Sequence, residues 1–116
     1  MAVQKYVLIS GSGSVSNGTQ TIAIIAAPTA PAALRLTAGV LAITVAATGG
    51  GGVVSLKDGS NVIQTWDANA ISNFQFTFGE GIGFPLTPGN ALNLTVSAAV
   101  TNQATVFCMV VGYRMG

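Results

Sequence analysis

Turn-forming residues divide this chain into short runs of apolar or alternating residues, and this division constrains the fold more than any other feature. No segment carries apolar residues at helical spacing. In residues 91–99, leucine, valine and alanine alternate with asparagine, threonine and serine, which is typical of a strand with one buried face. The pair Asp58-Gly59 between two such runs predicts a tight β-hairpin. We therefore expect an all-β protein.

The whole chain, residues 1–116, has the length of a single domain. We expect strands at residues 3–9, 19–26, 33–37, 40–47, 53–57, 61–66, 74–78, 91–99 and 104–114. We expect turns or loops at residues 11–14, 17–18, 28–31, 38–39, 49–52, 67–73, 79–85, 88–90 and 102. Eight or nine short strands in one domain predict an antiparallel sandwich of two sheets.

Charged side chains are scarce, at 6% of the residues where about 25% is usual. They are Lys5, Arg35, Lys57, Asp58, Asp67, Glu80 and Arg114. A soluble monomer normally spreads more charge over its surface, so this surface is either neutral and polar or covered by partners. The net charge of +1 and the scattered cations argue against nucleic acid and against an anionic membrane surface as partners.

Three segments, residues 22–27, 40–47 and 106–111, are apolar on both faces of the expected strands. An antiparallel sheet normally has one solvated face, so such strands need a second cover, which a subunit interface supplies. The alternative is that small alanines are tolerated on the surface. For the last strand we favour the interface, and Phe107, Met109 and Tyr113 are its candidate residues. Phe76, on the aromatic strand at 74–78, is a further candidate.

Residues suited to catalysis are few. The chain has no histidine, which removes the usual general base and the commonest metal ligand. Asp58 is explained by its turn, and a catalytic carboxylate pair would require Asp67 and Glu80 to converge. The glycine-rich segments 49–52 and 79–83 lack the lysine and hydroxyl of a phosphate-binding loop. We expect no enzyme activity, cofactor, metal site or small-molecule substrate.

The remaining distinctive residues have plain structural interpretations. Cys108, the only cysteine, lies in the apolar run 106–110 and is expected to be a buried hydrophobe. Four glycines interrupt the uncharged segment 36–55, so we expect no transmembrane helix. The apolar run 6–9 is too short for the core of an export signal. A lone Trp66 is more often a core or interface residue than a carbohydrate platform, but Trp66 and Glu80 are our candidate partner-contact residues.

From residue 52 onward the order of motifs is similar to that of a known group of proteins. A glycine, strand and charged hairpin at 52–60 precede Phe74-Gln75-Phe76, the turn at 85–89, the alternating strand at 91–99 and the ending Val110-Val111-Gly112-Tyr113-Arg114. This order resembles capsid decoration (cement) proteins of tailed bacteriophages, which have a jelly-roll, tumour-necrosis-factor-like trimeric fold. The resemblance covers residues 52–114.

The resemblance implies a homotrimer that is made in the bacterial cytoplasm and sits on the outer capsid of the virion, where it clamps the major capsid protein. A trimer matches a three-fold site in symmetry, and three simultaneous contacts give avidity. The alternative is a fibre or head-fibre knob that binds a host receptor or glycan through Trp66 or the Glu80 loop. We favour the cement protein because a knob is expected to follow a shaft segment in the same chain, and we expect no such segment before residue 3. A secreted lectin-like or lipocalin-like carrier is expected to carry an export signal.

Overall fold

Nine strands make up the secondary structure of the part of the chain that the computed structural model describes, namely residues 6–15, 20–46, 52–78, 83–97 and 104–115. They are β1 (Tyr6–Val15), β2 (Gln20–Ile25), β3 (Ala33–Val45), β4 (Val53–Asp58), β5 (Asn61–Asp67), β6 (Ser72–Thr77), β7 (Phe84–Pro85), β8 (Leu92–Ser97) and β9 (Thr105–Met115). Within these residues, no helix has the length and apolarity needed to cross a membrane.

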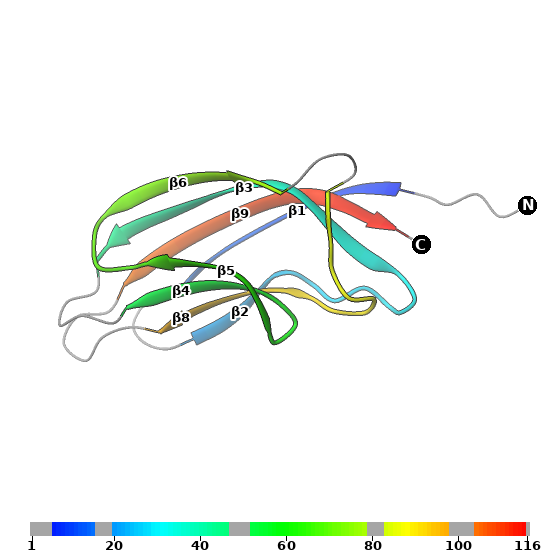
Figure 1. Ribbon diagram of the computed structural model, residues 1–116, viewed down its shortest axis with the longest axis horizontal. Coiled ribbons are helices and arrows are strands. Elements are labelled where there is room, and N and C mark those ends of the chain that lie inside the picture. The colour runs from blue at the N-terminus through cyan, green and yellow to red at the C-terminus, as the bar shows by residue number, and fades with distance from the viewer. Residues whose placement is uncertain (1–5, 16–19, 47–51, 79–82, 98–103, 116) are drawn as a thin grey trace, which may run out of the picture.

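The strands form two antiparallel sheets stacked face to face (Figure 1). One has the order β1-β9-β3-β6, with the short β7 also paired to β3, and the other has the order β2-β8-β4-β5. The pairs β1–β9, β2–β8, β3–β6 and β4–β5 are nested in the chain, as in a long antiparallel ribbon rolled into a sandwich. This strand order is that of a jelly roll. The expected antiparallel two-sheet sandwich is confirmed.

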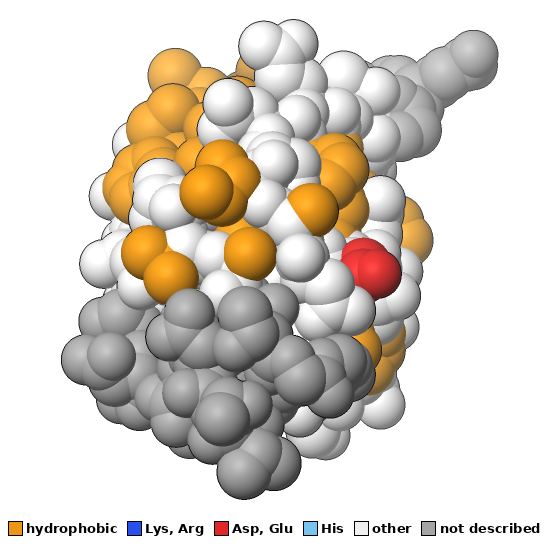
Figure 2. All heavy atoms as spheres, turned by 90° about the vertical axis from the view of Figure 1, so that its left-hand side faces the viewer, with side chains coloured by type: hydrophobic (Ala, Val, Ile, Leu, Met, Phe, Trp, Pro, Cys, Tyr) orange, Lys and Arg blue, Asp and Glu red, His pale blue; other side chains and the backbone are white. Residues whose placement is uncertain are grey.

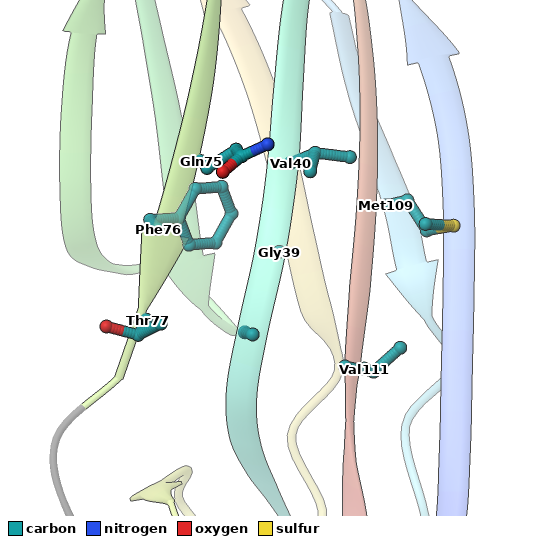
Figure 3. Close-up of a pocket in the computed structure, with 8 residues that line it drawn as sticks. Gly39, Val40, Gln75, Phe76, Thr77, Met109 and Val111 are labelled. Atoms are coloured by element: carbon teal, nitrogen blue, oxygen red, sulfur yellow. The ribbon is translucent and has the colours of Figure 1, made fainter.

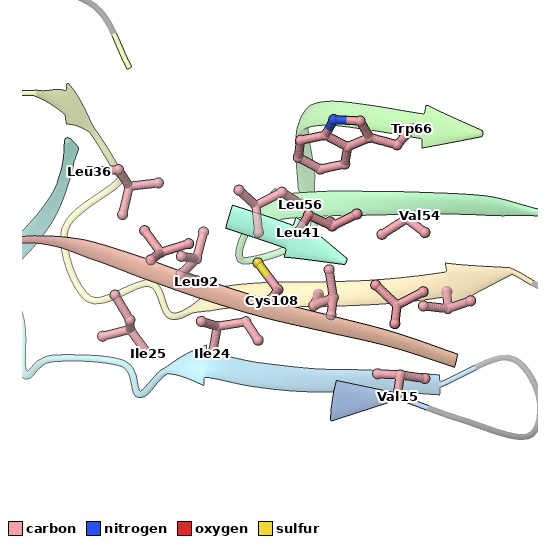
Figure 4. Packing of buried hydrophobic residues seen from close by; sticks show 14 of the residues in the cluster. Val15, Ile24, Ile25, Leu36, Leu41, Val54, Leu56, Trp66, Leu92 and Cys108 are labelled. Atoms are coloured by element: carbon pink, nitrogen blue, oxygen red, sulfur yellow. The ribbon is translucent and has the colours of Figure 1, made fainter. Parts of the chain in front are cut away.

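The core lies between the sheets and consists of the inward residues of each strand (Figure 4). On β8, Leu92, Leu94 and Val96 are fully buried and alternate with polar residues, as the sequence predicts. Cys108 is buried beside them, and its desolvation raises the pKa of its thiol to about 12. The expectation that Cys108 is a buried hydrophobe is confirmed.

The prediction of a flexible loop at residues 11–14 is wrong, because this segment continues β1 in register with β9. Gly11 and Gly13 point inward at the edge where β1 meets β2 of the opposite sheet. A Cβ on Gly11 would overlap the carbonyl of Ile24, and a Cβ on Gly13 would lie 2.7 Å from the Cδ1 of Ile22. These glycines therefore allow the two sheets to approach closely, and they do not end the strand.

The prediction of a turn at Ala38-Gly39 is also wrong, because β3 is continuous from Ala33 to Val45. Gly39 is paired on both sides, with Phe76 of β6 and Val110 of β9. A Cβ on Gly39 would lie 2.5 Å from the Cζ of Phe76, so the glycine makes room for the aromatic ring. The register with β9 shifts between Leu36 and Ala38, which is a bulge within the strand and not a reversal of the chain.

Two predicted turns are confirmed. Gly59 has a φ of 60° in the hairpin between β4 and β5, and Gly89 has a φ of 80° in the turn before β8. Asp58 ties these turns together, because its carboxylate accepts hydrogen bonds from the backbone N–H and the hydroxyl of Thr87 and from the amide of Asn90. In the expected loop at 79–85, the last two residues form β7. The turns expected at 17–18 and 102, and residues 49–51, lie outside the described residues.

Candidate functional site

The last strand, β9, has two apolar faces. Val106, Cys108 and Val110 are fully buried between the sheets. The alternate residues Phe107, Met109 and Val111 point outward, and 39%, 42% and 36% of their surfaces are exposed. The residue pattern predicts this arrangement, and the structure confirms its geometry.

The outward residues of β9 lie beside small or β-branched residues of β3. In the register of the sheet, Val111, Met109 and Phe107 are paired with Ala38, Val40 and Ala42 respectively. We call these six residues the apolar stripe. Exposed serines of β1 flank the stripe on one side, and exposed asparagine, glutamine and threonine of β6 flank it on the other. The flanking residues are Ser10, Ser12, Ser14, Asn73, Gln75 and Thr77.

Phe107, Met109 and Val111 each lie in one row of residues that crosses the four strands. In each row the order from β1 to β6 is polar, apolar, apolar, polar, and none of the three rows contains a charged residue. The described part of the end face in Figure 2 also shows hydrophobic side chains among neutral polar groups, with little charge. At about 3.4 Å per residue and 4.8 Å per strand, the ten residues of β1 and four strands span up to about 650 Å² in projection. A standard interface buries about 800 Å² per partner, so this face has a suitable size.

A groove of about 490 Å³ crosses the apolar stripe over β3 (Figure 3). Ala38 and Gly39 contribute little or no side chain and form its floor. Residues of β6, among them Gln75, line one side, and Met109 and Val111 of β9 line the other. The groove therefore follows from two small residues placed between larger neighbours.

The outer face of the four-stranded sheet is different. Thr21, Thr95, Ser55 and Thr65 form one row across its four strands. The hydroxyls of Thr21 and Thr95 are 3.0 Å apart and hydrogen-bonded. Hydroxyl groups of this kind suit a face in contact with water, which is the usual state of one face of an antiparallel sheet.

The three segments that appear apolar on both faces in the sequence are not equivalent. In the segment 22–27, the exposed residues are the alanines Ala23, Ala26 and Ala27, so the alternative of tolerated surface alanines applies there. In β9 the outward residues are large. The four-stranded sheet also exposes Val53 and Val62, but a continuous row of large outward residues along one strand occurs in β9 among the described strands.

Two interface candidates are not among the six residues of the apolar stripe. Tyr113 is half-buried on the outer face, in a row with Leu8 and Arg35 near the end of the sheet. Phe76 points into the sandwich, where its ring centroid is 5.2 Å from that of Trp66 and 5.3 Å from that of Phe78. Phe76 therefore packs in the core beneath Gly39, where its ring also lines the groove over β3.

The partner-contact candidates receive little support. Trp66 is only 9% exposed and packs against Phe74 and Phe76, so the core interpretation of this residue applies. Glu80 lies outside the described residues.

Both carboxylates in the described part of the chain have local structural roles. Asp58 joins two turns, and Asp67 accepts a hydrogen bond from the backbone N–H of Asn69. Within the described ranges, no group of three histidine, cysteine, aspartate or glutamate residues is placed to hold a metal ion. The apolar stripe is therefore the most distinctive surface of the part of the chain described.

The contribution of β3 to this surface is only partly apparent in the sequence, where residues 40–47 are apolar on both faces. The bulge near Thr37 shifts the alternation of β3, so that the inward Leu34 and Leu36 are followed by outward Ala38 and Val40. The signal available in the sequence was the uninterrupted apolar run from Val40 to Ile43.

No known family model matches this chain, and no curated protein is significantly similar to it.

Proposed function

We propose that this protein is a structural component of a virus particle, a decoration (cement) protein. It forms a homotrimer on the outer capsid surface, contacts the major capsid protein and stabilises the shell. The observation that carries the proposal is the apolar stripe, which in a single subunit lies in water.

The energy of covering the stripe favours self-association. Phe107, Met109 and Val111 together expose about 200 Å² of mainly apolar surface, taking roughly 150–200 Å² for each fully exposed residue. At about 25 cal/mol per Å², burying it contributes up to about 5 kcal/mol per subunit. This gain offsets a large part of the cost of association, estimated at about 4–15 kcal/mol.

The choice of a trimer and of a capsid rests on the resemblance of residues 52–114 to cement proteins. A trimer shares the symmetry of a three-fold position on a capsid, so each subunit makes the same contact with the shell. The neutral apolar face makes association less dependent on salt than charged contacts would be.

The alternative, a knob that binds a receptor or glycan, is less well supported. A glycan-stacking role for Trp66 requires an accessible ring, and this ring is packed in the core. The knob hypothesis then depends on the Glu80 loop.

Thermal stability of virus particles tests the proposed function. Particles that lack this protein are expected to release their DNA at a lower temperature than complete particles. Addition of the purified protein should restore the release temperature, and the variant Met109→Glu, which disrupts the stripe, should not. Equal release temperatures for complete particles and for particles that lack this protein would contradict the cement role.

A further inference from the structure

A second surface feature, a cleft at the end of the sandwich, lies apart from the apolar stripe. It has a volume of about 440 Å³, within the range of about 300–1,000 Å³ that is usual for ligand sites. Most of its lining is apolar, with Pro31 before β3, Pro85 in β7, Leu86 and Pro88 after it and Met115 at the end of β9. Arg35 is the charged residue of this lining.

Hydrogen bonds between turns hold the cleft walls in place. The backbone N–H of Leu86 donates to the carbonyl of Leu34 over 2.9 Å, and that of Gly89 donates to the carbonyl of Ala32, also over 2.9 Å. Thr87, between the wall residues Leu86 and Pro88, is bound by the carboxylate of Asp58. The cleft is therefore formed before any ligand arrives, which reduces the entropy lost on binding.

Arg35 is half-buried, and the acceptors of its guanidinium N–H groups are weak. Its Nε–H points to the Sδ of Met115, and a thioether is a poor acceptor for a charged donor. An Nη1–H group points to the carbonyl of Gly83 over 3.4 Å, longer than the usual 2.7–3.2 Å. A guanidinium has five N–H groups, so three of them have no acceptor among the described residues.

We propose that this cleft binds a carboxylate that carries a compact apolar body, with Arg35 as the residue that recognises the carboxylate. Arginine pairs with carboxylates through two parallel hydrogen bonds, and the guanidinium has N–H groups left for this. One cation matches one carboxylate, whereas a phosphate dianion generally needs more donors. The proline, leucine and methionine walls suit an apolar group attached to the carboxylate. Arg35 lies in the row of Tyr113, the next outward residue of β9 after Val111, so the cleft lies beyond the end of the apolar stripe on the same sheet.

The test uses N-acetyl-leucine as the probe and N-acetyl-leucinamide, which lacks the charge, as its control. Binding is followed by NMR through the Nε–H signal of Arg35 and the backbone amides of Leu34 and Leu86. The acid is expected to bind with a dissociation constant on the order of 1 mM, a usual value for a ligand of this size. The amide is expected to bind at least tenfold more weakly. Equal affinity for the two probes, or no shift in these signals, would overturn the proposal.

Protein variants separate Arg35 from general charge. Arg35→Met should reduce the affinity for the acid at least tenfold, whereas Lys57→Met, which removes a cation of the other sheet, should leave it unchanged. Undiminished binding by Arg35→Met would also refute the assignment. Glu80→Gln should not alter the affinity. A tenfold increase in that variant would mean that the chain's own carboxylate occupies Arg35.

Discussion

The variant Met109→Glu is the most informative perturbation of this protein. Met109 lies at the centre of the apolar stripe, between Ser12 of β1 and Val40 of β3. Its neighbour Cys108 faces the core, so the substitution changes the outer face and leaves the core intact. We expect the variant to fold and to lose the ability to form a trimer.

The size of the effect on trimer stability follows from the exposed surface of Met109. Met109 is 42% exposed, which corresponds to about 80 Å² and to about 2 kcal/mol at 25 cal/mol per Å². Three subunits lose about 6 kcal/mol together, which weakens the trimer by about 10⁴-fold. A buried carboxylate without a partner adds a further penalty.

Sedimentation velocity over a dilution series measures the trimer dissociation constant, and thermal unfolding shows that the variant is folded. Thr65→Glu, which places the same charge on the outer face of the four-stranded sheet, is the matched control and should remain trimeric. A Met109→Glu trimer as stable as the wild type would show that the stripe is not the interface.

Three further predictions concern the fold. Leu94→Ala, in the fully buried row of β8, should lower the free energy of unfolding by about 2–5 kcal/mol in urea titrations. Gly11→Ala should destabilise the protein by about 1–3 kcal/mol, because the new methyl group overlaps the carbonyl of Ile24; an unchanged urea midpoint would show that β1 and β2 are less closely packed than described. The pKa of Cys108 is raised from 9.0 to about 12, so the unfolded chain loses its thiol proton first and the free energy of unfolding should fall as pH rises from about 9 towards 12, by up to about 1.4 kcal/mol per unit. Comparison with Cys108→Ala isolates this effect, and the same pH dependence in both proteins would contradict it.

Local signals in the sequence were sufficient for much of the fold. The alternation on β8 predicts its buried face, and Asp58-Gly59 predicts the hairpin between β4 and β5. The failures concern glycines. Gly13 and Gly39 are turn signals in the sequence, but their role is set by Ile22 and Phe76, which approach from other strands. Contacts of this kind depend on the tertiary arrangement and are not encoded by neighbouring residues.

The candidate site was predictable only in part, because contacts between distant strands also decide which of its residues come together. Phe107 and Met109 alternate with buried residues on one strand, so their outward position follows from period-two geometry. Phe76 has the same kind of pattern, but which of its two faces is inward depends on the register with β3. The cleft at Arg35 combines residues from three separate segments, and no local pattern indicates it.

Sedimentation equilibrium of the purified protein at micromolar concentration tests most directly whether the apolar stripe is covered by other subunits. We expect a mass of about 35 kDa, three times the 11.6 kDa of the chain. A stable species of 11.6 kDa would mean that Phe107, Met109 and Val111 remain in water, and it would contradict the account.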